Sequence, residues 1–244
     1  MTPRAPPSKR SFGTPLPGVP FQRLAGRLIV VEGADGSGRT TECALLQEDL
    51  EIQGHAVVHT GLRRSNLVSE EIDEAKQGHV LGSTTLALFY AVDFADQLEN
   101  KIIPALAAGS VVLADRYIYT LMARAIVRGA PREWARRLYS FALRPDLTVF
   151  LDTRSELLLH RAFARYGSLD YWESGMDLGL SRDRFESFFL FQEKLREQFD
   201  WMAREYGFVR VNGNRTPTAV HADVRRAVTG ILGPEPSSPI RARP

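Results

Sequence analysis

The sequence predicts an α/β protein in which a five-stranded parallel sheet carries helices on both faces. Short apolar runs alternate with longer amphipathic segments along the middle of the chain. Strands buried on both faces read as continuous apolar runs, and the crossovers between parallel strands cover the sheet with helices. Polar residues follow three of the apolar runs, at 33–40, 115–116 and 152–154. Because ligands of such sheets bind beyond the carboxyl ends of the strands, we expect these clusters to form one site.

The individual elements follow from apolar periodicity. The expected strands are short apolar runs at 28–31, 56–59, 111–114, 147–151 and 208–211. We expect helices at 40–52, 69–76, 83–108, 117–128, 132–142, 155–163, 184–206 and 216–232. Pro104 falls near the last turn of the long helix at 83–108, and a loop rich in glycine and aspartate spans 165–182.

The ends of the chain differ in composition from the middle. Ten of the 14 prolines lie before residue 27 or after residue 232, and the first 26 residues contain four basic side chains and no acid. Such segments bury too little apolar surface to order themselves. We therefore expect disordered tails at 1–26 and 233–244, and one domain at 27–232.

Charge and cysteine content exclude several classes of protein. The net charge is only +2, which argues against a protein that coats nucleic acid, so no stable nucleic-acid partner is expected. No segment approaches the roughly 20 apolar residues that span a bilayer, so no membrane partner is expected. The single cysteine, Cys43, fits a reducing compartment. A cytoplasmic enzyme fits these features, as do many other proteins, and we expect a cytoplasmic location.

A glycine-rich phosphate loop is the strongest functional signal. Gly33 and Gly38 are five positions apart and are followed by Arg39 and Thr40. Glycines allow a turn whose amide hydrogens point at phosphate oxygens, the helix that follows adds its positive end, and the hydroxyl ligates Mg²⁺. We therefore predict that ATP and Mg²⁺ bind here. The expected nucleotide-binding residues are Gly33, Ala34, Asp35, Gly36, Ser37, Gly38, Arg39, Thr40 and Thr41.

Arg39 departs from the usual pattern, which has lysine at this position. Lysine acts as a compact point charge, whereas arginine is longer, planar and bidentate. Both are cationic at neutral pH, so the attraction for phosphate is kept. The geometry differs, and phosphoryl transfer depends on positioning. The loop therefore predicts nucleotide binding more directly than it predicts turnover.

Two segments resemble the thymidylate kinases, within the nucleoside-monophosphate kinase group of P-loop kinases. They are residues 31–38, which include the loop, and residues 113–117, which contain Asp115, Arg116 and Tyr117. Residues 103–106 and 145–152 also match the family's order, and the likeness spans about 27–232. The resemblance implies a P-loop kinase fold with a lid at about 161–182. It also implies phosphoryl transfer from ATP to dTMP, giving dTDP for dTTP biosynthesis, and a homodimer.

The resemblance also implies roles for individual residues. The catalytic set would be Arg39, Asp115, Arg116, Arg161 and Arg165, of which the last two would reach the transferring phosphate from the lid. Asp115 and Thr40 would hold Mg²⁺. The acceptor would be bound by Asp35 at its sugar, Arg116 and Arg64 at its phosphate, Tyr90 at its base, and Arg124.

Three positions of the acceptor site depart from the family. Phe94 stands where many members have an arginine, and Arg124 and Ala125 stand where many have an aromatic residue and a glutamine. They leave one alternative open, in which the chain phosphorylates a deoxynucleoside or another small acceptor. Arg39 and the basic N-terminal tail leave a second open, a nucleotide-binding regulator with weak or no turnover. Tyr90 could equally be a core residue, and Arg161 could be a solvated surface charge.

Overall fold

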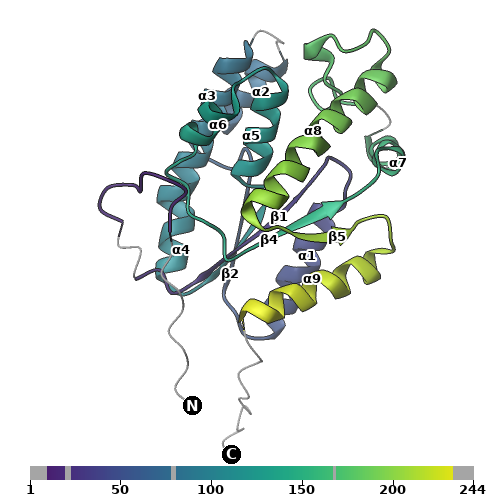
Figure 1. Cartoon of the computed structure of the whole chain (residues 1–244). Helices are drawn as coiled ribbons and strands as arrows, with labels where there is room; N and C mark the ends of the chain where they lie inside the picture. Colours follow the sequence, from purple (N-terminus) through teal and green to yellow (C-terminus); the bar gives the residue numbers. More distant parts are fainter. Residues whose placement is uncertain (1–9, 20–22, 78–80, 167–168, 233–244) are drawn as a thin grey trace, which may run out of the picture.

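The computed structural model describes residues 10–19, 23–77, 81–166 and 169–232. Its five parallel strands lie in the order β2-β3-β1-β4-β5 (Figure 1). They are β1 (Arg27–Gly33), β2 (Val57–Gly61), β3 (Val111–Asp115), β4 (Leu147–Asp152) and β5 (Val209–Asn212). The α-helices are α1 (Arg39–Ile52), α2 (Ser69–Gln77), α3 (Ser83–Gln97), α4 (Ile103–Ala107), α5 (Ile118–Val127), α6 (Arg132–Leu138), α7 (Ser155–Tyr166), α8 (Arg184–Tyr206) and α9 (Pro217–Leu232). The predicted α/β fold with a five-stranded parallel sheet is confirmed.

The register of the central strands determines which residues meet at the carboxyl edge of the sheet. Strand β1 pairs with β3 so that Val31 lies opposite Asp115, and with β4 so that Gly33 lies opposite Leu151. The amide of Arg116 donates to the carbonyl of Val31 at 3.0 Å. The loop that follows β1 therefore begins directly beside Asp115 and Arg116, as the sequence predicts.

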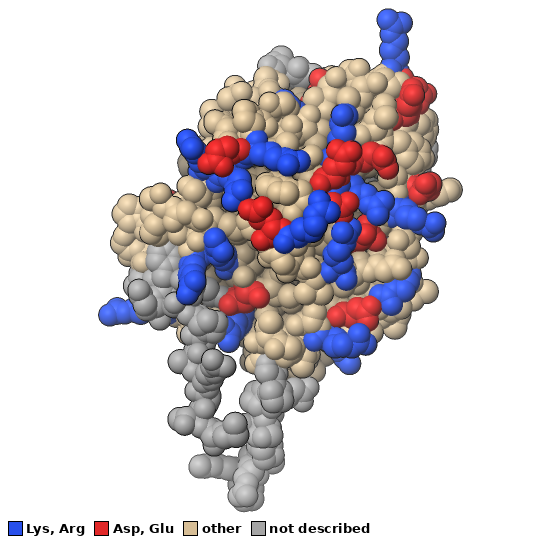
Figure 2. Space-filling view, in the orientation of Figure 1, with Lys and Arg blue, Asp and Glu red and all other residues tan. Residues whose placement is uncertain are grey.

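The surface mixes both signs of charge. On the face seen in Figure 2, lysines and arginines are interspersed with aspartates and glutamates, in keeping with the net charge of +2. Within the part of the chain that the structure describes, no helix is long and apolar enough to cross a membrane.

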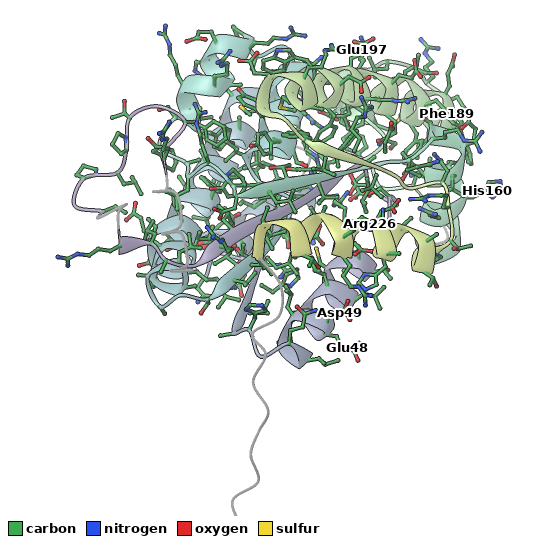
Figure 3. The ribbon with its side chains drawn as sticks, turned by 60° about the horizontal axis from the view of Figure 1, so that its bottom comes forward. Glu48, Asp49, His160, Phe189, Glu197 and Arg226 are labelled. Atoms are coloured by element: carbon green, nitrogen blue, oxygen red, sulfur yellow. The ribbon has the colours of Figure 1, made fainter. Side chains whose placement is uncertain are left out.

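Alternation along the strands divides the core into two layers. Ile29 and Val31 face one cluster, to which α1 and α9 contribute. Leu28 and Val30 face the other cluster, to which α3, α5 and α8 contribute. Figure 3 shows α1, with Asp49, lying alongside α9, with Arg226. The helix that continues the phosphate loop thus packs on one face of the sheet, and α9 packs beside it on the same face.

The single helix expected at 83–108 is in fact three segments. Helix α3 ends at Gln97, a π-helical turn spans Leu98–Ile102, and α4 begins at Ile103. Pro104 is the physical reason, because it has no N–H to donate and its ring clashes with the carbonyl four residues earlier. A wider π turn before the proline relieves that clash.

The expectation of a disordered tail is wrong for residues 10–19. The amide of Phe12 donates to the carbonyl of Ala142 at 3.0 Å, and the Phe12 ring meets Tyr119 and Tyr206 edge-on, with centroids 5.9 and 5.4 Å apart. The burial of one aromatic side chain against other rings orders this segment, although its average composition is typical of disordered chains. The expectation is also wrong for residues 23–26, where Leu24 is buried in the core. The remaining parts of the predicted tails, at 1–9, 20–22 and 233–244, lie outside the described residues.

Candidate functional site

A cavity of about 320 Å³ opens at the carboxyl edge of β1 and β3. Its lining combines the glycine loop with basic and acidic side chains from several elements. These residues are Asp35, Gly36, Ser37, Gly38, Arg39, Thr40, Thr41, Leu62, Arg63, Arg64, Asp115, Arg116, Arg161 and Glu173. The structure therefore brings the predicted loop, Arg64, Asp115, Arg116 and Arg161 to one place.

The backbone of the loop requires glycine at particular positions. Gly36 and Gly38 have φ angles of 81° and 98°, in the left-handed region that other residues rarely adopt. A Cβ atom at Gly33 would lie 2.6 Å from Ser37 Oγ and 3.0 Å from the carbonyl oxygen of Leu151. The loop closes tightly over β4 and leads directly into α1. This geometry fits a nucleotide phosphate, because the glycine loop and the N-terminus of α1 line the cavity together.

Arg39 is folded inward beneath the loop. Its Nε donates to Asp115 Oδ1 at 2.9 Å, and its Nη1 donates to the carbonyls of Gly33 and Ala34. The side chain is only 7% exposed. The guanidinium is therefore bound by acceptors of the protein itself, which a lysine ammonium could not reach in the same planar arrangement.

Asp115 also contacts the hydroxyl predicted to ligate Mg²⁺. Thr40 Oγ1 donates to Asp115 Oδ2 at 2.9 Å, so Thr40 and Arg39 engage the two carboxylate oxygens. Mg²⁺ prefers such hard oxygen ligands and completes its shell with phosphate and water. The oxygen pair at Thr40 and Asp115 fits that ion.

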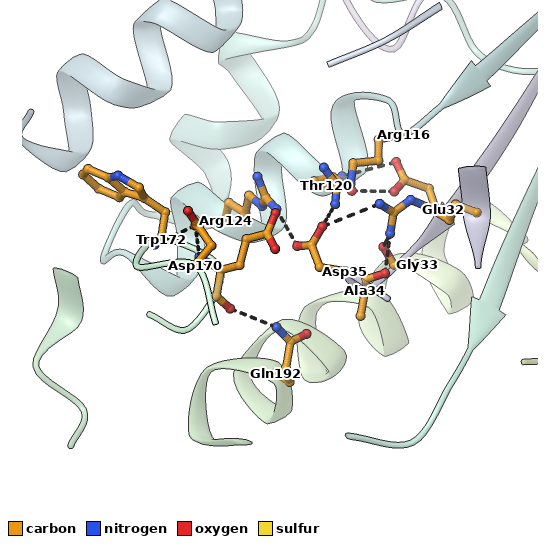
Figure 4. A network of polar contacts seen from close by, with 12 residues as sticks. Glu32, Gly33, Ala34, Asp35, Arg116, Thr120, Arg124, Asp170, Trp172 and Gln192 are labelled. Carbon is orange, nitrogen blue, oxygen red and sulfur yellow. Dashed lines mark hydrogen bonds and ion pairs between the residues drawn. The ribbon is translucent and has the colours of Figure 1, made fainter. Parts of the chain in front are cut away.

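The carboxylate of Asp35 lies beside three arginines from different parts of the fold (Figure 4). It pairs with Arg116 from the end of β3, accepts from Arg124 Nη2 of α5 at 2.7 Å, and lies 3.7 Å from Arg39 Nη2. The side chains of Asp35, Arg116 and Arg124 are 13 to 15% exposed. Arg116 adopts a φ of 72°, which turns it away from the strand. This arginine therefore pairs with the carboxylate of the loop, and the site is rich in phosphate-binding donors.

Sequence analysis missed Glu32, a carboxyl group buried at the end of β1. It accepts hydrogen bonds from the amides of Tyr117 and Thr120, at 2.9 and 3.3 Å, and from the Thr120 hydroxyl at 2.6 Å. Burial raises the pKa of Glu32 from 4.5 to about 6, although these donors and Arg39 oppose the rise. Glu32 thus anchors the start of α5. Its only signal in the sequence is an acid next to an apolar run.

Asp93 on α3 is a second residue that sequence analysis missed. Its buried carboxylate accepts from the amides of Arg63 and Ser65, both at 2.9 Å, and from Gln97 Nε2 at 3.0 Å. The pKa of Asp93 is raised, because the effect of burial outweighs the opposing effect of the backbone donors. These bonds fix the loop after β2, which carries Arg64 to the cavity.

Of the two arginines expected in the lid, only Arg161 can be placed. Its Nη1 donates to the carbonyls of Gly36 and Ser37, both at 3.2 Å, and its Nη2 donates to Gly213 at 3.3 Å. Arg161 therefore contacts the phosphate loop and is not a solvated surface charge. The side chain of Arg165 lies outside the described residues.

A second hollow lies beside the cavity, between α2, α3, α5 and residues 169–178. Apolar and aromatic side chains dominate its lining. It is formed by Lys76, Ser83, Leu86, Ala87, Tyr90, Leu121, Arg124, Ala125, Arg128, Tyr139 and Trp172. Tyr90 is 6% exposed, so it belongs both to the core and to this wall. Phe94 lies in the core instead, edge-on to Tyr117 at 5.0 Å.

Residues 169–178 form one wall of the site. Trp172 Nε1 donates to the carbonyl of Lys76 at 2.9 Å, and Asp177 forms an ion pair with Arg128 at 2.7 Å. Gln192 of α8 donates to the carbonyl of Glu173 at 3.2 Å (Figure 4). The segment thus packs on α8 and also reaches across to α2 and α5.

Comparison with known proteins gives a consistent result over most of the chain. The family model for thymidylate kinase matches residues 31–224. A probable thymidylate kinase 2 from Saccharolobus solfataricus is 36% identical over 211 residues, covering 86% of this chain and 97% of that protein. A probable thymidylate kinase from Pyrococcus abyssi is 32% identical, covering 82% and 95%. A thymidylate kinase from Ruegeria pomeroyi is 36% identical, covering 83% and 94%.

Proposed function

The chain belongs to the thymidylate kinase family, and we propose that it transfers the γ-phosphoryl group of ATP to dTMP, giving dTDP and ADP. The observation that carries the proposal is the single cavity in which the glycine loop faces Arg64, Arg116 and Asp115. Such a cavity can hold two phosphorylated molecules with their phosphates adjacent. The similarity to proteins named as thymidylate kinases favours neither a deoxynucleoside kinase nor a regulator without turnover.

The loop and α1 form the donor side of the proposed site. The loop amides and the N-terminus of α1 bind the phosphates of ATP, and Arg161 reaches the same loop from α7. Thr40 and Asp115 would hold Mg²⁺, which when bound neutralises the charge of the phosphates. Arg39 keeps the Asp115 carboxylate in place through the bond from its Nε.

The arginines around Asp35 and the loop after β2 form the acceptor side. Arg116 and Arg64 bind the phosphate of dTMP, and its base enters the hollow beside Tyr90. An oxygen of the dTMP phosphate attacks the γ-phosphorus, and the bond between that phosphorus and the β-phosphate oxygen breaks, so that ADP leaves. The protein contributes position and positive charge to this transfer, with Arg161 and Arg165 proposed to reach the moving group.

An acceptor panel tests the proposal. Purified protein is incubated with ATP, Mg²⁺ and each nucleoside monophosphate in turn, and ADP release is followed in a coupled assay. We expect dTMP to stimulate release most strongly, and Asp115→Asn to reduce that release by about 10²-fold or more. Release that no nucleoside monophosphate stimulates would refute the function.

Two further expectations belong to this proposal. We propose a homodimer, supported by Leu88 and Val92 of α3, which are 46% and 43% exposed and lie one turn apart on one helix face. Light scattering of the purified chain measures its mass directly. We also propose that the enzyme acts in the cytoplasm, where its single free cysteine, Cys43, stays reduced.

A further inference from the structure

The hollow beside the phosphate cavity offers a base more hydrogen-bond donors than acceptors. Three aromatic rings, from Tyr90, Tyr139 and Trp172, and several aliphatic side chains form its apolar walls. The polar residues among those that line it are two arginines, a lysine and a serine, with no carboxylate and no side-chain amide. A flat ring with carbonyl oxygens at its edge suits such a lining.

Four of the five N–H donors of Arg128 are bonded within the protein, so this arginine has little to offer a ligand. Its Nε and Nη2 donate to the two carboxylate oxygens of Asp177 at 2.7 and 3.1 Å. Nη2 and Nη1 also donate to the carbonyls of Trp172 and Arg124, at 3.2 and 3.4 Å. The guanidinium lies 5.2 Å from the ring centroid of Phe191 and is 5% exposed. Arg128 therefore supports residues 169–178.

Arg124 is the arginine of the lining that remains; Lys76 of α2 is the other cation there. Among the residues that the structure describes, Asp35 is the hydrogen-bond acceptor of Arg124, at 2.7 Å from Nη2. A guanidinium has five N–H donors, so most of them stay available to a ligand. Arg124 lines the hollow while Asp35 lines the phosphate cavity, which places this guanidinium where the two spaces meet. Helix α3, on the other side of the hollow, contains no lysine or arginine.

We propose that Arg124 determines the base specificity of the acceptor site by donating to a carbonyl oxygen of the base. Thymine and uracil carry an oxygen at the position where cytosine carries an amino group. A guanidinium donates but cannot accept, so it binds the oxygen and is left opposite another donor when cytosine enters. Buried sites built to hydrogen-bond one group discriminate strongly against a ligand that lacks it. This inference rests on the proposed function and assigns its specificity to a residue of α5.

The alternative role of Arg124 is to pair with Asp35 and nothing more. In that case, loss of Arg124 would weaken all nucleoside monophosphates by the same factor. The two roles therefore differ in the ratio of kcat/KM for dTMP to kcat/KM for dCMP, which a structural pair does not change. The ratio for dUMP to dCMP should change in parallel with it, because dUMP has the same carbonyl edge as dTMP.

The experiment measures these ratios for the wild-type chain and for Arg124→Gln, Arg124→Lys and Arg137→Gln. Arg137 is an exposed arginine of α6 whose bonding partner is Glu133. We expect the wild type to prefer dTMP and dUMP to dCMP, and Arg124→Gln to reduce that preference by about 10- to 100-fold, because a side-chain amide can donate or accept. Arg124→Lys should keep most of the preference, and Arg137→Gln all of it.

Two results would overturn the inference. One is a wild type that uses dTMP and dCMP equally, and the other is an Arg124→Gln variant whose ratio is unchanged because all acceptors weaken equally or not at all. If Arg124→Gln does not fold, calorimetric binding of dTMP and dCMP to Arg124→Lys and Arg124→Met decides in its place, with a reduced ratio expected for the methionine only. A wild type that phosphorylates no nucleoside monophosphate would instead refute the proposed function.

Discussion

Glu32 shows how one buried side chain couples the sheet to the helix that carries Arg124. Its carboxyl group accepts hydrogen bonds from three donors at the start of α5, yet burial still raises its pKa to about 6. The protonated form is therefore favoured in the folded state relative to the unfolded chain. Stability from this group is complete below the unfolded pKa of about 4.5 and is lost as the pH rises through 6.

Replacement of this carboxyl by an amide should remove that pH dependence. For Glu32→Gln, the free energy of unfolding relative to wild type should rise by ~2 kcal/mol between pH 4.5 and pH 7, the free-energy equivalent of the pKa change. Urea unfolding at pH 4.5, 5.5 and 7 measures it. Glu48→Gln, at an exposed position of α1, serves as the control with an unchanged slope. Parallel profiles for wild type and Glu32→Gln would contradict the assignment.

Arg39 is the residue at which a change of charge and a change of shape can be separated. We expect Arg39→Met, which removes the cation between Asp35 and Asp115, to lower kcat by about 10²- to 10³-fold. Arg39→Lys keeps the charge but loses the planar bonds to Gly33 and Ala34, so its kcat should stay within about tenfold of wild type. Steady-state kinetics with ATP and dTMP decide, and equal activity of Arg39→Met and wild type would show that the cation is not needed.

At the scale of elements, the loop after β2 depends on helix α3 for its conformation. The carboxylate of Asp93 accepts hydrogen bonds from two backbone amides of that loop. Arg64, in the same loop, donates to His59 Nδ1 at 2.8 Å and lines the cavity. Asp93 is therefore a positioning residue: it acts on the acceptor through Arg64.

A change at Asp93 should appear in the acceptor KM. In Asp93→Asn, the amide nitrogen faces one of the two backbone donors, which leaves that donor unpaired and shifts Arg64. We expect the KM for dTMP to rise about tenfold while the KM for ATP stays the same. Glu99→Gln, at an exposed acid in the π-helical turn after α3, should change neither constant. Equal rises in both KM values would indicate a general loss of structure.

The elements also differ in how well the sequence predicts them. The loop at 33–40 was predictable because spacing within a short segment encodes its geometry, and Asp115 because it directly follows a short apolar run. Glu32 and Asp93 were not, because each acts on residues distant in sequence, such as Tyr117, 85 positions from Glu32. The packing of Phe12 was not predictable for the same reason, because its partners Tyr119 and Tyr206 are also distant in sequence. Local sequence patterns predict the helices and strands. Which polar side chains become buried and paired depends on packing between segments that are distant in sequence.

At the scale of the whole molecule, the end of the chain holds the helix that begins at the phosphate loop. His221 of α9 bonds to two acids of α1, Glu42 through Nδ1 at 2.9 Å and Asp49 through Nε2 at 3.0 Å. Burial lowers the pKa of His221, but the bonds and charges of Glu42 and Asp49 outweigh it, so the pKa is raised. The charged imidazole therefore links the first and the last helix of the domain.

The sign of the resulting pH dependence is opposite to what an acid with a lowered pKa would give. The contribution of His221 is complete below the unfolded pKa of about 6.5 and is lost as the pH rises through the higher folded value. We expect His221→Gln to destabilise the protein by ~1 kcal/mol at pH 6 and by less at pH 8.5, because partly exposed ion pairs contribute at about that level. His160→Gln, at a position on α7, is the matched control, with no such change between the two pH values. Urea unfolding of the three proteins at both pH values tests the link. A His221→Gln variant that is equally destabilised at pH 6 and pH 8.5 would show that the imidazole acts through packing and not through its charge.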